Sequence, residues 1–167
     1  YSRNFKNQGG SLGFDGIDDY VNISSFASNQ KTYTIEAWVK RENTGYIIDS
    51  ETNDEVRFVA MALGKYTVDG RLSFYDGTWK DFGSDSFIPI DEQHHLAIVF
   101  DNFNGTAIGY VDGISINTVS YSGKNIGDLV AIGSKRGGSS QFYKGLISEL
   151  RVWNAVRTQQ EIQNNKN

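Results

Sequence analysis

The sequence GFDGIDDYV occupies residues 13–21 and combines a turn signal with acidic residues. Its Asp15-Gly16 pair favours a tight turn, because glycine adopts the positive φ that such turns require. Asp18 and Asp19 follow, and the next residues alternate in the manner of a strand. The pattern therefore predicts a strand, an acidic turn and a second strand. Two interpretations are open: the first hairpin of a β protein, or a cation site that ties the two ends of the chain together.

The composition predicts a single all-β domain covering residues 1–167. The chain has 167 residues, enough for one ordinary domain with its own core and too few for two. It contains 18 glycines and one proline, and 13% of its residues are aromatic, a balance typical of many strands joined by tight turns. The net charge of −4 and the lack of any lysine and arginine cluster exclude a nucleic-acid partner bound through its phosphates.

The sequence also excludes several kinds of site. It contains no cysteine, so disulfides, thiolate zinc sites and cysteine nucleophiles are excluded. No apolar run reaches the roughly 20 residues of a membrane-spanning helix, so we expect no membrane insertion. Residues 1–4 carry no signal-peptide core, which predicts either a cytosolic chain or a processed or excised piece of a longer protein.

Turn signals divide the rest of the chain into short strands. Two-residue turn pairs stand at 69–70, 76–77, 104–105 and 112–113. Alternation between them predicts strands with one apolar face, formed by Tyr33, Ile35, Ala37 and Val39, by Leu72 and Phe74, and by Leu96, Ile98 and Phe100. A last strand, 146–153, is predicted to place Leu146, Leu150 and Val152 on one face and Ile147, Glu149, Arg151 and Trp153 on the other.

One helix is predicted, at the end of the sequence. Thr158 and Glu161 form a capping box, in which each side chain accepts a hydrogen bond from the backbone N–H of the other residue. The segment that follows is short and polar, so it caps the fold and adds little to the core. About a dozen strands and this helix predict an antiparallel two-sheet sandwich with one short C-terminal helix.

Four landmarks of the sequence fall in the order of a known family. They are residues 12–21, 33–40, 94–101 with 110–113, and 145–154. With these landmarks the chain resembles a laminin-G-like domain of the concanavalin A-like lectin/glucanase superfamily, in its bacterial-style branch. The resemblance implies a jelly-roll sandwich with one concave sheet. It also implies a non-catalytic role, most often glycan binding or adhesion, within larger secreted or cell-surface proteins.

The resemblance further implies a calcium site on the rim of the domain. Family members often bind one Ca²⁺ with oxygen ligands from the first turn and an acidic residue of the last strand. Carboxylate oxygens are what Ca²⁺ needs, and Asp15, Asp18 and Asp19 are the candidate metal ligands here. Ser148 stands where the family usually has aspartate, and serine is a much poorer ligand. The alternative is that Asp15 and Asp18 form the turn by hydrogen-bonding their own backbone.

We expect the two histidines and the acidic residues of the strands to be structural. His94 and His95 are adjacent, so they point to opposite faces of a strand and cannot chelate one metal together. Glycoside hydrolysis needs a pair of carboxylates on one face, whereas Glu36 is alone on its strand face and is expected to pair with Arg151 or Arg57. No serine stands in a nucleophile-elbow motif. We therefore predict no catalytic residues.

A ligand-binding surface is predicted around the turn at residues 75–81. Sugars stack on aromatic rings and hydrogen-bond to planar polar groups, and this turn offers both kinds of side chain. The candidate ligand-binding residues are Tyr75, Asp76, Trp79 and Lys80, with Asp54, Arg57 and Arg136 from nearby loops. An acidic sugar would favour the three cations of this set, Arg57, Lys80 and Arg136. The alternative is that the aromatic residues only cover the edge of the sheet.

The sequence thus predicts a carbohydrate-binding, lectin-like module, with glycan at the concave face or the loops at its rim. Two other functions remain open. One is an adhesion or structural module whose partner is a protein, and the other is a glycoside hydrolase or lyase.

Overall fold

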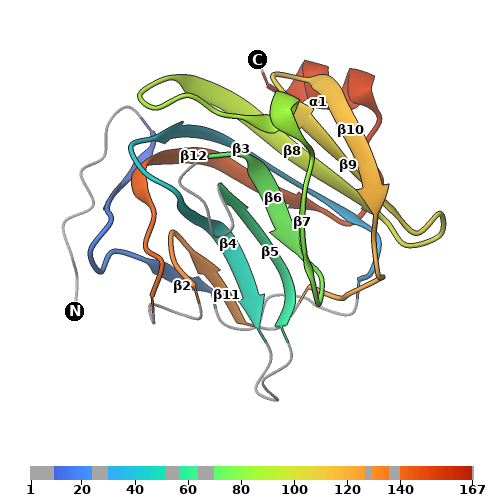
Figure 1. The fold of residues 1–167 in the computed structure, drawn as a ribbon, viewed down its shortest axis with the longest axis horizontal. Coiled ribbons are helices and arrows are strands. Elements are labelled where there is room, and N and C mark those ends of the chain that lie inside the picture. The colour runs from blue at the N-terminus through green and yellow to red at the C-terminus, as the bar shows by residue number, and fades with distance from the viewer. Residues whose placement is uncertain are drawn as a thin grey trace.

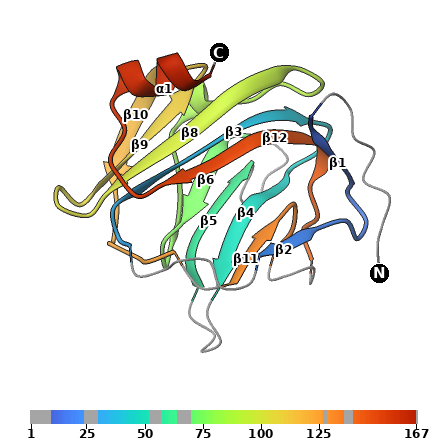
Figure 2. The ribbon, with the colours of Figure 1, turned by 180° about the vertical axis from the view of Figure 1, so that it is seen from behind.

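The computed structural model describes residues 10–23, 30–51, 57–63, 70–126, 129–135 and 140–166. Its strands form two antiparallel six-stranded sheets, which confirms the predicted jelly-roll sandwich (Figures 1 and 2). The first sheet has the order β1 (Leu12–Asp15), β12 (Lys144–Trp153), β3 (Tyr33–Arg41), β8 (Gln93–Asp101), β9 (Thr106–Val111) and β10 (Ile114–Ser120). The second has the order β2 (Val21–Ile23), β11 (Leu129–Ile132), β4 (Gly45–Glu51), β5 (Arg57–Leu63), β6 (Leu72–Tyr75) and β7 (Trp79–Asp81).

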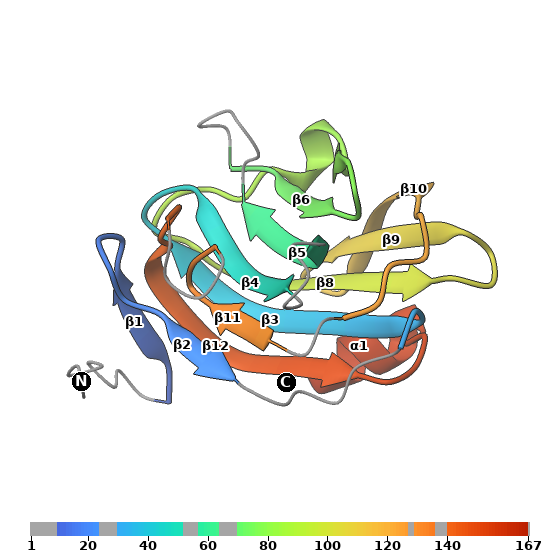
Figure 3. The ribbon, with the colours of Figure 1, turned by 90° about the horizontal axis from the view of Figure 1, so that it is seen from below.

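Two short helices complete the described chain. The 3₁₀ helix η1 (Ser84–Ser86) follows β7, and the α-helix α1 (Gln159–Asn165) follows β12. Thr158 and Glu161 make both hydrogen bonds of the predicted capping box at the start of α1. The helix lies on the side of the first sheet that faces away from the second sheet (Figure 3). No helix among the described residues is long and apolar enough to span a membrane.

The acidic turn after β1 does not form a hairpin. β1 pairs with β12, with Phe14 opposite Gly145, whereas β2 pairs with β11 in the other sheet. The turn therefore carries the chain from one sheet to the other, and the hairpin interpretation is wrong. The two ends of the chain are indeed joined, and the backbone pairing of the first strand with the last is what joins them.

The core lies between the sheets, where the predicted alternation places it. Tyr33, Ile35, Ala37 and Val39 of β3 and the apolar residues 96, 98 and 100 of β8 are all buried in it. The valine, leucine, isoleucine and phenylalanine side chains among them each contribute about 1.5–3 kcal/mol to stability when fully removed from water. The opposite faces of β3 and β8 point outward, and Ala97 and Val99 of β8 pack there against Ile162 of α1.

β12 departs from the alternation predicted for residues 146–153. Glu149 has a φ of 50°, in the left-handed region, and the pairing with β3 shifts register between Ser148 and Arg151. Such a bulge changes the phase of the side chains that follow it. Ile147 is therefore buried in the same core against which Leu150 packs, and the prediction that they occupy opposite faces is wrong.

Candidate functional site

Three aromatic rings gather on the outer face of the second sheet. Trp79 lies edge-on to Tyr46, with 5.7 Å between ring centroids, and edge-on to Tyr75, with 5.5 Å. These three residues, the aromatic cluster, pack with buried Ala62 and are separate from the core between the sheets. Tyr46 is buried, and Tyr75 and Trp79 are half-buried. The rings hold one another in fixed orientations and leave part of Tyr75 and Trp79 open to solvent.

Strand register explains why these rings meet. Tyr46 pairs with Ala62 across β4 and β5, and Tyr75 pairs with Trp79 across β6 and β7. Because paired residues share a face, the small side chain of Ala62 leaves room beside Tyr46 for the two larger rings. Tyr46 was not among the predicted site residues, because the sequence does not show which strands lie side by side.

A row of paired residues extends from the aromatic cluster across the strands of the second sheet, which lie side by side from β2 to β7 in Figure 1. Successive strand pairings place one residue of each strand in this row, in the order Asn22, Ala131, Asp49, Ala60, Tyr75 and Trp79. Asn22 is exposed at the β2 end, and Asp49 is buried midway. The row thus brings an amide and a carboxylate onto the face that carries the rings, a combination suited to sugar hydroxyls and the apolar faces of a sugar ring.

Asp76 and Lys80 anchor the turn that carries Trp79. Lys80 Nζ lies 2.8 Å from Asp76 Oδ2 and also donates to the carbonyl of Ser120. The backbone N–H of Ser122 donates to Asp76 Oδ2 at 2.8 Å. Burial by itself would raise the pKa of Asp76, but the bonds from Lys80 and Ser122 outweigh it and hold the pKa below its ordinary value. These contacts fix the β6–β7 turn to the segment after β10 and so position Trp79.

The other predicted ligand residues lie outside this description. Asp54 and Arg136 are not among the described residues, and Arg57 is described only as the first residue of β5. Their part in the site stays a prediction.

The acidic turn gathers three carboxylates. Asp15, Asp18 and Asp19 each offer one oxygen within 4.8 Å of the others. The same residues also hydrogen-bond the turn itself: Asp15 Oδ1 accepts the backbone N–H of Ile17 at 2.7 Å, and Asp19 Oδ2 accepts that of Asp15 at 3.1 Å. Turn formation and a set of hard oxygen ligands are therefore combined in one structure, and the set suits Ca²⁺ chemically.

Ser148 does not face this acidic turn. Asp15 of β1 pairs with Lys144 of β12, whereas Ser148 pairs with Trp38 of β3. At the rise of an extended strand, Ser148 lies about 13 Å farther along β12 than Lys144. The serine therefore has no direct bearing on a metal at the turn. Lys144 is the last-strand residue beside it, and its Nζ is 3.0 Å from Glu42 Oε2.

The outer face of the first sheet carries a buried polar cluster. Glu36 and His95 have no exposed surface. Glu36 Oε1 accepts from Trp153 Nε1 at 2.9 Å and lies 3.4 Å from Nη1 of Arg151, so the predicted ion pair with Arg151 is confirmed. His94 takes a separate place, with Nδ1 2.8 Å from Asp112 Oδ2. Burial lowers the pKa of His95, which keeps its ring neutral near pH 7.

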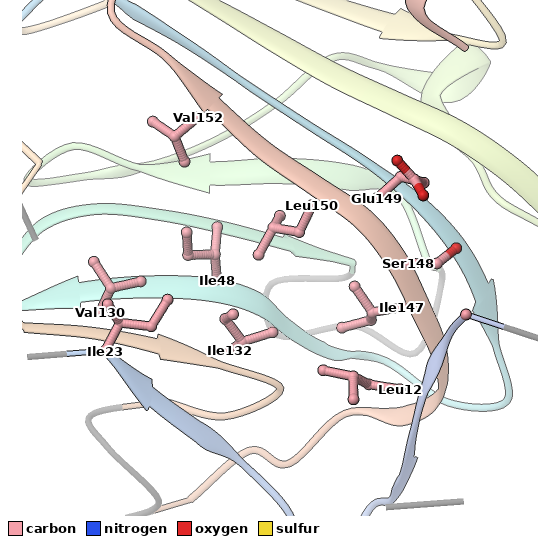
Figure 4. Close-up of a pocket in the computed structure, with 11 residues that line it drawn as sticks. Leu12, Ile23, Ile48, Val130, Ile132, Ile147, Ser148, Glu149, Leu150 and Val152 are labelled. Carbon is pink, nitrogen blue, oxygen red and sulfur yellow. The ribbon is translucent and has the colours of Figure 1, made fainter. Parts of the chain in front are cut away.

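An apolar cavity of about 320 Å³ lies between the sheets at the end formed by β1, β2 and β12. Eight aliphatic side chains line it: Leu12, Ile23, Ile48, Val130, Ile132, Ile147, Leu150 and Val152. Ser148 and Glu149 stand on the other side of β12 from these side chains (Figure 4). Since sugars need polar partners for their hydroxyls, this lining does not suit them.

Comparison with known proteins places the fold in a family. A family model described as the concanavalin A-like lectin/glucanases superfamily matches residues 15–163. No curated protein matches the sequence. Among solved structures, a heptameric SAP-like pentraxin from Limulus polyphemus aligns with a TM-score of 0.75 and 21% identity, over 92% of this chain and 79% of the pentraxin.

Two further structures belong to proteins that act on sugars. Domain 4 of an extracellular arabinanase from Geobacillus stearothermophilus, solved with arabinotriose, aligns with a TM-score of 0.63 and 21% identity, over 92% of this chain and 70% of that one. A sialidase from Trypanosoma rangeli, solved with sialic acid, aligns with a TM-score of 0.65 and 13% identity, over 95% of this chain but only 27% of the sialidase. These likenesses concern the fold. The match of the family model over most of the sequence shows that the chain belongs to the concanavalin A-like lectin/glucanases superfamily.

Proposed function

We propose that this chain is a non-catalytic, lectin-like module that binds glycan on the outer face of the second sheet. Trp79 and Tyr75 are the proposed contact residues, and Tyr46 supports them from below. The observation that carries the proposal is the edge-on packing of these rings, which fixes Trp79 between Tyr46 and Tyr75. A sugar that stacks on a ring already held in place loses less entropy on the protein side than one that must order a mobile side chain.

The row of paired residues supplies the polar part of the proposed site. Asn22 lies on the same face as the rings and is exposed, and its amide is of the kind that hydrogen-bonds sugar hydroxyls, whereas Asp49 is buried beneath this face. The row crosses the strands, so it suits a linear oligosaccharide better than a single sugar unit. We expect micromolar or weaker affinity, as is usual for a shallow, wet site.

Two lines of support favour binding over catalysis. Glu36, on the other sheet, is buried and paired with Arg151 and Trp153, so it does not face a ligand on the aromatic cluster. The arabinanase neighbour is a domain of an enzyme that was solved with arabinotriose, which offers an analogy at the level of the fold. We further propose that the chain is one module of a larger secreted or cell-surface protein.

We also propose that the acidic turn binds Ca²⁺ through Asp15, Asp18 and Asp19. The donor set fits this ion, because Ca²⁺ prefers carboxylate and backbone oxygens in flexible arrangements. The metal would stabilise the turn where the chain passes from the first sheet to the second.

A glycan array probed with the purified protein, with and without Ca²⁺, tests the proposed function. We expect binding to oligosaccharides, with about five- to 150-fold weaker binding in Trp79→Ala, if sugar stacking is worth as much as the stacking of a base on an aromatic ring, on the order of 1–3 kcal/mol. Phe103→Ala is the matched control, because this ring is 93% exposed in the β8–β9 turn and lies outside the proposed site.

Trp79 packs on Tyr46, so its truncation also needs a check on the fold. Trp79→Phe keeps a ring of smaller area, and we expect intermediate affinity with an unchanged circular dichroism spectrum. An array that stays silent in both conditions would contradict glycan binding and favour a protein partner. Release of new reducing ends from a bound glycan would contradict the non-catalytic assignment.

A further inference from the structure

Helix α1 is held on the first sheet mainly by polar contacts. Ile162 is its buried residue, packed with Ala97, Val99 and Tyr110 of β8 and β9. One buried isoleucine contributes only about 1.5–3 kcal/mol, which is little for docking a helix. The position of α1 therefore depends strongly on hydrogen bonds made by the end of the helix.

Those hydrogen bonds come from the sheet beneath the C-terminal end of the helix. Arg151 Nη1 donates to the carbonyl of Asn165 at 3.1 Å, and Trp38 Nε1 donates to that of Lys166 at 3.2 Å. Lys166 Nζ in turn donates to the carbonyl of Asp112 at 2.9 Å. The last carbonyls of a helix lack partners within it and carry partial negative charge, so a guanidinium and an indole N–H are well suited to cap them.

The two capping side chains contact two buried polar residues of the first sheet: Arg151 contacts Glu36, and Trp38 contacts His95. Glu36 lies 3.4 Å from Arg151 Nη1, and the His95 ring lies edge-on to Trp38 with 5.4 Å between centroids. His95 Nε2 is 3.8 Å from Glu36 Oε2. Among the described residues, neither nitrogen of His95 has a hydrogen-bond partner, and Glu36 Oε2 has none either. A fully buried histidine without partners for its ring nitrogens tolerates the neutral form much better than the charged one.

We propose that α1 is a proton-operated latch, docked on the first sheet while His95 is neutral and released when His95 is protonated. Release would let water reach the imidazolium and expose Trp38. The latch is thus a conformational device on the face opposite the proposed glycan site, and it does not depend on that site.

Burial of His95 sets this direction, and it outweighs the charges around the ring, of which the two carboxylates act more strongly than the two cations. Arg151 of β12 and Lys166 after α1 repel a protonated ring, whereas Glu36 of β3 and Asp112 of the β9–β10 turn attract it. Glu36 Oε1 is engaged with Arg151 and Trp153, whereas Glu36 Oε2 is the oxygen that faces His95 Nε2. Asp112 is engaged with His94 and with the backbone N–H of His95. Burial is the largest influence and lowers the pKa of His95 below its ordinary value of 6.5. The docked form therefore binds fewer protons than the released form.

This difference in bound protons makes the docking of α1 depend on pH. Docking of α1 is fully favoured above the ordinary pKa of histidine, near pH 6.5, and weakens as the pH falls below it. One proton changes the docking equilibrium by at most about tenfold per pH unit in that range. The shift continues until the pH falls below the pKa of His95 in the docked form.

Hydrogen–deuterium exchange of the full chain at pH 7.5 and pH 5.5, corrected for the intrinsic exchange rate, tests the latch. We expect protection of the peptide covering residues 155–166 to fall about three- to tenfold at the lower pH, with protection of β8 unchanged. In His95→Gln, which cannot be charged, this pH response should vanish. His94→Gln, one position away, should keep it. The proposal would be overturned if protection of this peptide did not change with pH in the wild type, or if it still changed with pH in His95→Gln.

A titration of the wild-type chain by NMR keeps the test valid if His95→Gln fails to fold. The His95 ring should titrate below pH 6.5, together with the loss of contacts between Ile162 and Tyr110. Titration of His95 near its ordinary pKa with α1 still in place would equally overturn the latch. Glycan binding at the aromatic cluster is measured separately, so failure of one proposal leaves the other intact.

Discussion

Gly145 illustrates how a single residue decides the meeting of the first and last strands. It pairs with both neighbours of β12, opposite Phe14 of β1 and Arg41 of β3. Its φ is 134°, a conformation that side chains with a Cβ rarely adopt. A Cβ there would also overlap the backbone carbonyl oxygen of Lys40, which cannot move without breaking the sheet. Only glycine satisfies both conditions.

We therefore predict that Gly145→Ala lowers the free energy of unfolding by more than about 3 kcal/mol, measured by urea denaturation. Gly77→Ala is the matched control. Its φ is 110°, but a Cβ there would meet only Lys124 Cε, at 3.6 Å. That variant should lose about 1–2 kcal/mol, from backbone strain alone. Equal losses in the two variants would show that the approach of Lys40 to Gly145 has no energetic weight.

At the scale of elements, the β6–β7 turn is tied to the segment after β10. The carboxylate of Asp76 pairs with Lys80 and accepts a hydrogen bond from the backbone N–H of Ser122. The backbone carbonyl of Asp76 accepts a hydrogen bond from Ser122 Oγ at 2.5 Å. The turn belongs to the second sheet and the segment after β10 leaves the first, so the contact joins the edges of the two layers. An exposed turn that carries the proposed ligand contact Trp79 is thereby held in one position.

The lowered pKa of Asp76 makes this connection sensitive to acid. The folded state favours the charged carboxylate of Asp76. The contribution of this carboxylate to the stability of the fold is therefore fully present above its ordinary pKa of 3.8 and is lost as the pH falls below it. We predict that Asp76→Asn is less stable than wild type at pH 7 by about 1–3 kcal/mol and that the gap narrows towards pH 2. Asp85→Asn, an exposed residue of η1, should show no such gap. The check is urea denaturation at each pH.

At the scale of the whole molecule, pairing between distant segments makes the sandwich one unit. β1 pairs with β12, and β12 pairs with β3, so the first sheet needs both ends of the sequence. The acidic turn lies directly after β1, at the passage to the second sheet. A ligand bound there only by the folded state stabilises the entire domain by mass action.

We predict that Ca²⁺ at 100 times its dissociation constant stabilises the domain by about 2.7 kcal/mol, which raises the melting temperature by about 5–10 °C. EDTA should reverse the increase. Asp18→Asn should abolish the response to Ca²⁺, whereas Asp91→Asn, in the turn before β8, should keep it. An identical melting curve in chelator and in added Ca²⁺ would count against the acidic turn as a metal site.

The sequence by itself determined the two-sheet antiparallel class, the buried faces of β3 and β8, the turn at residues 76–77 and the cap of α1. These features depend on neighbours within a few positions, since alternation, turn residues and capping boxes act locally. The ion pair of Glu36 was predicted with either Arg151 or Arg57, and the register of β3 with β12 selects Arg151.

Only the tertiary structure decided what depends on strand order and register. It separated β1 and β2 into different sheets, turned Ile147 into the core through the bulge at Glu149, and set Lys144 rather than Ser148 beside the acidic turn. It also brought Tyr46 to Trp79 and directed Asp76 and Lys80 to each other. A change of one residue in register moves every side chain to the other face of a sheet. Contacts between strands far apart in the sequence therefore arise only when the whole sandwich closes.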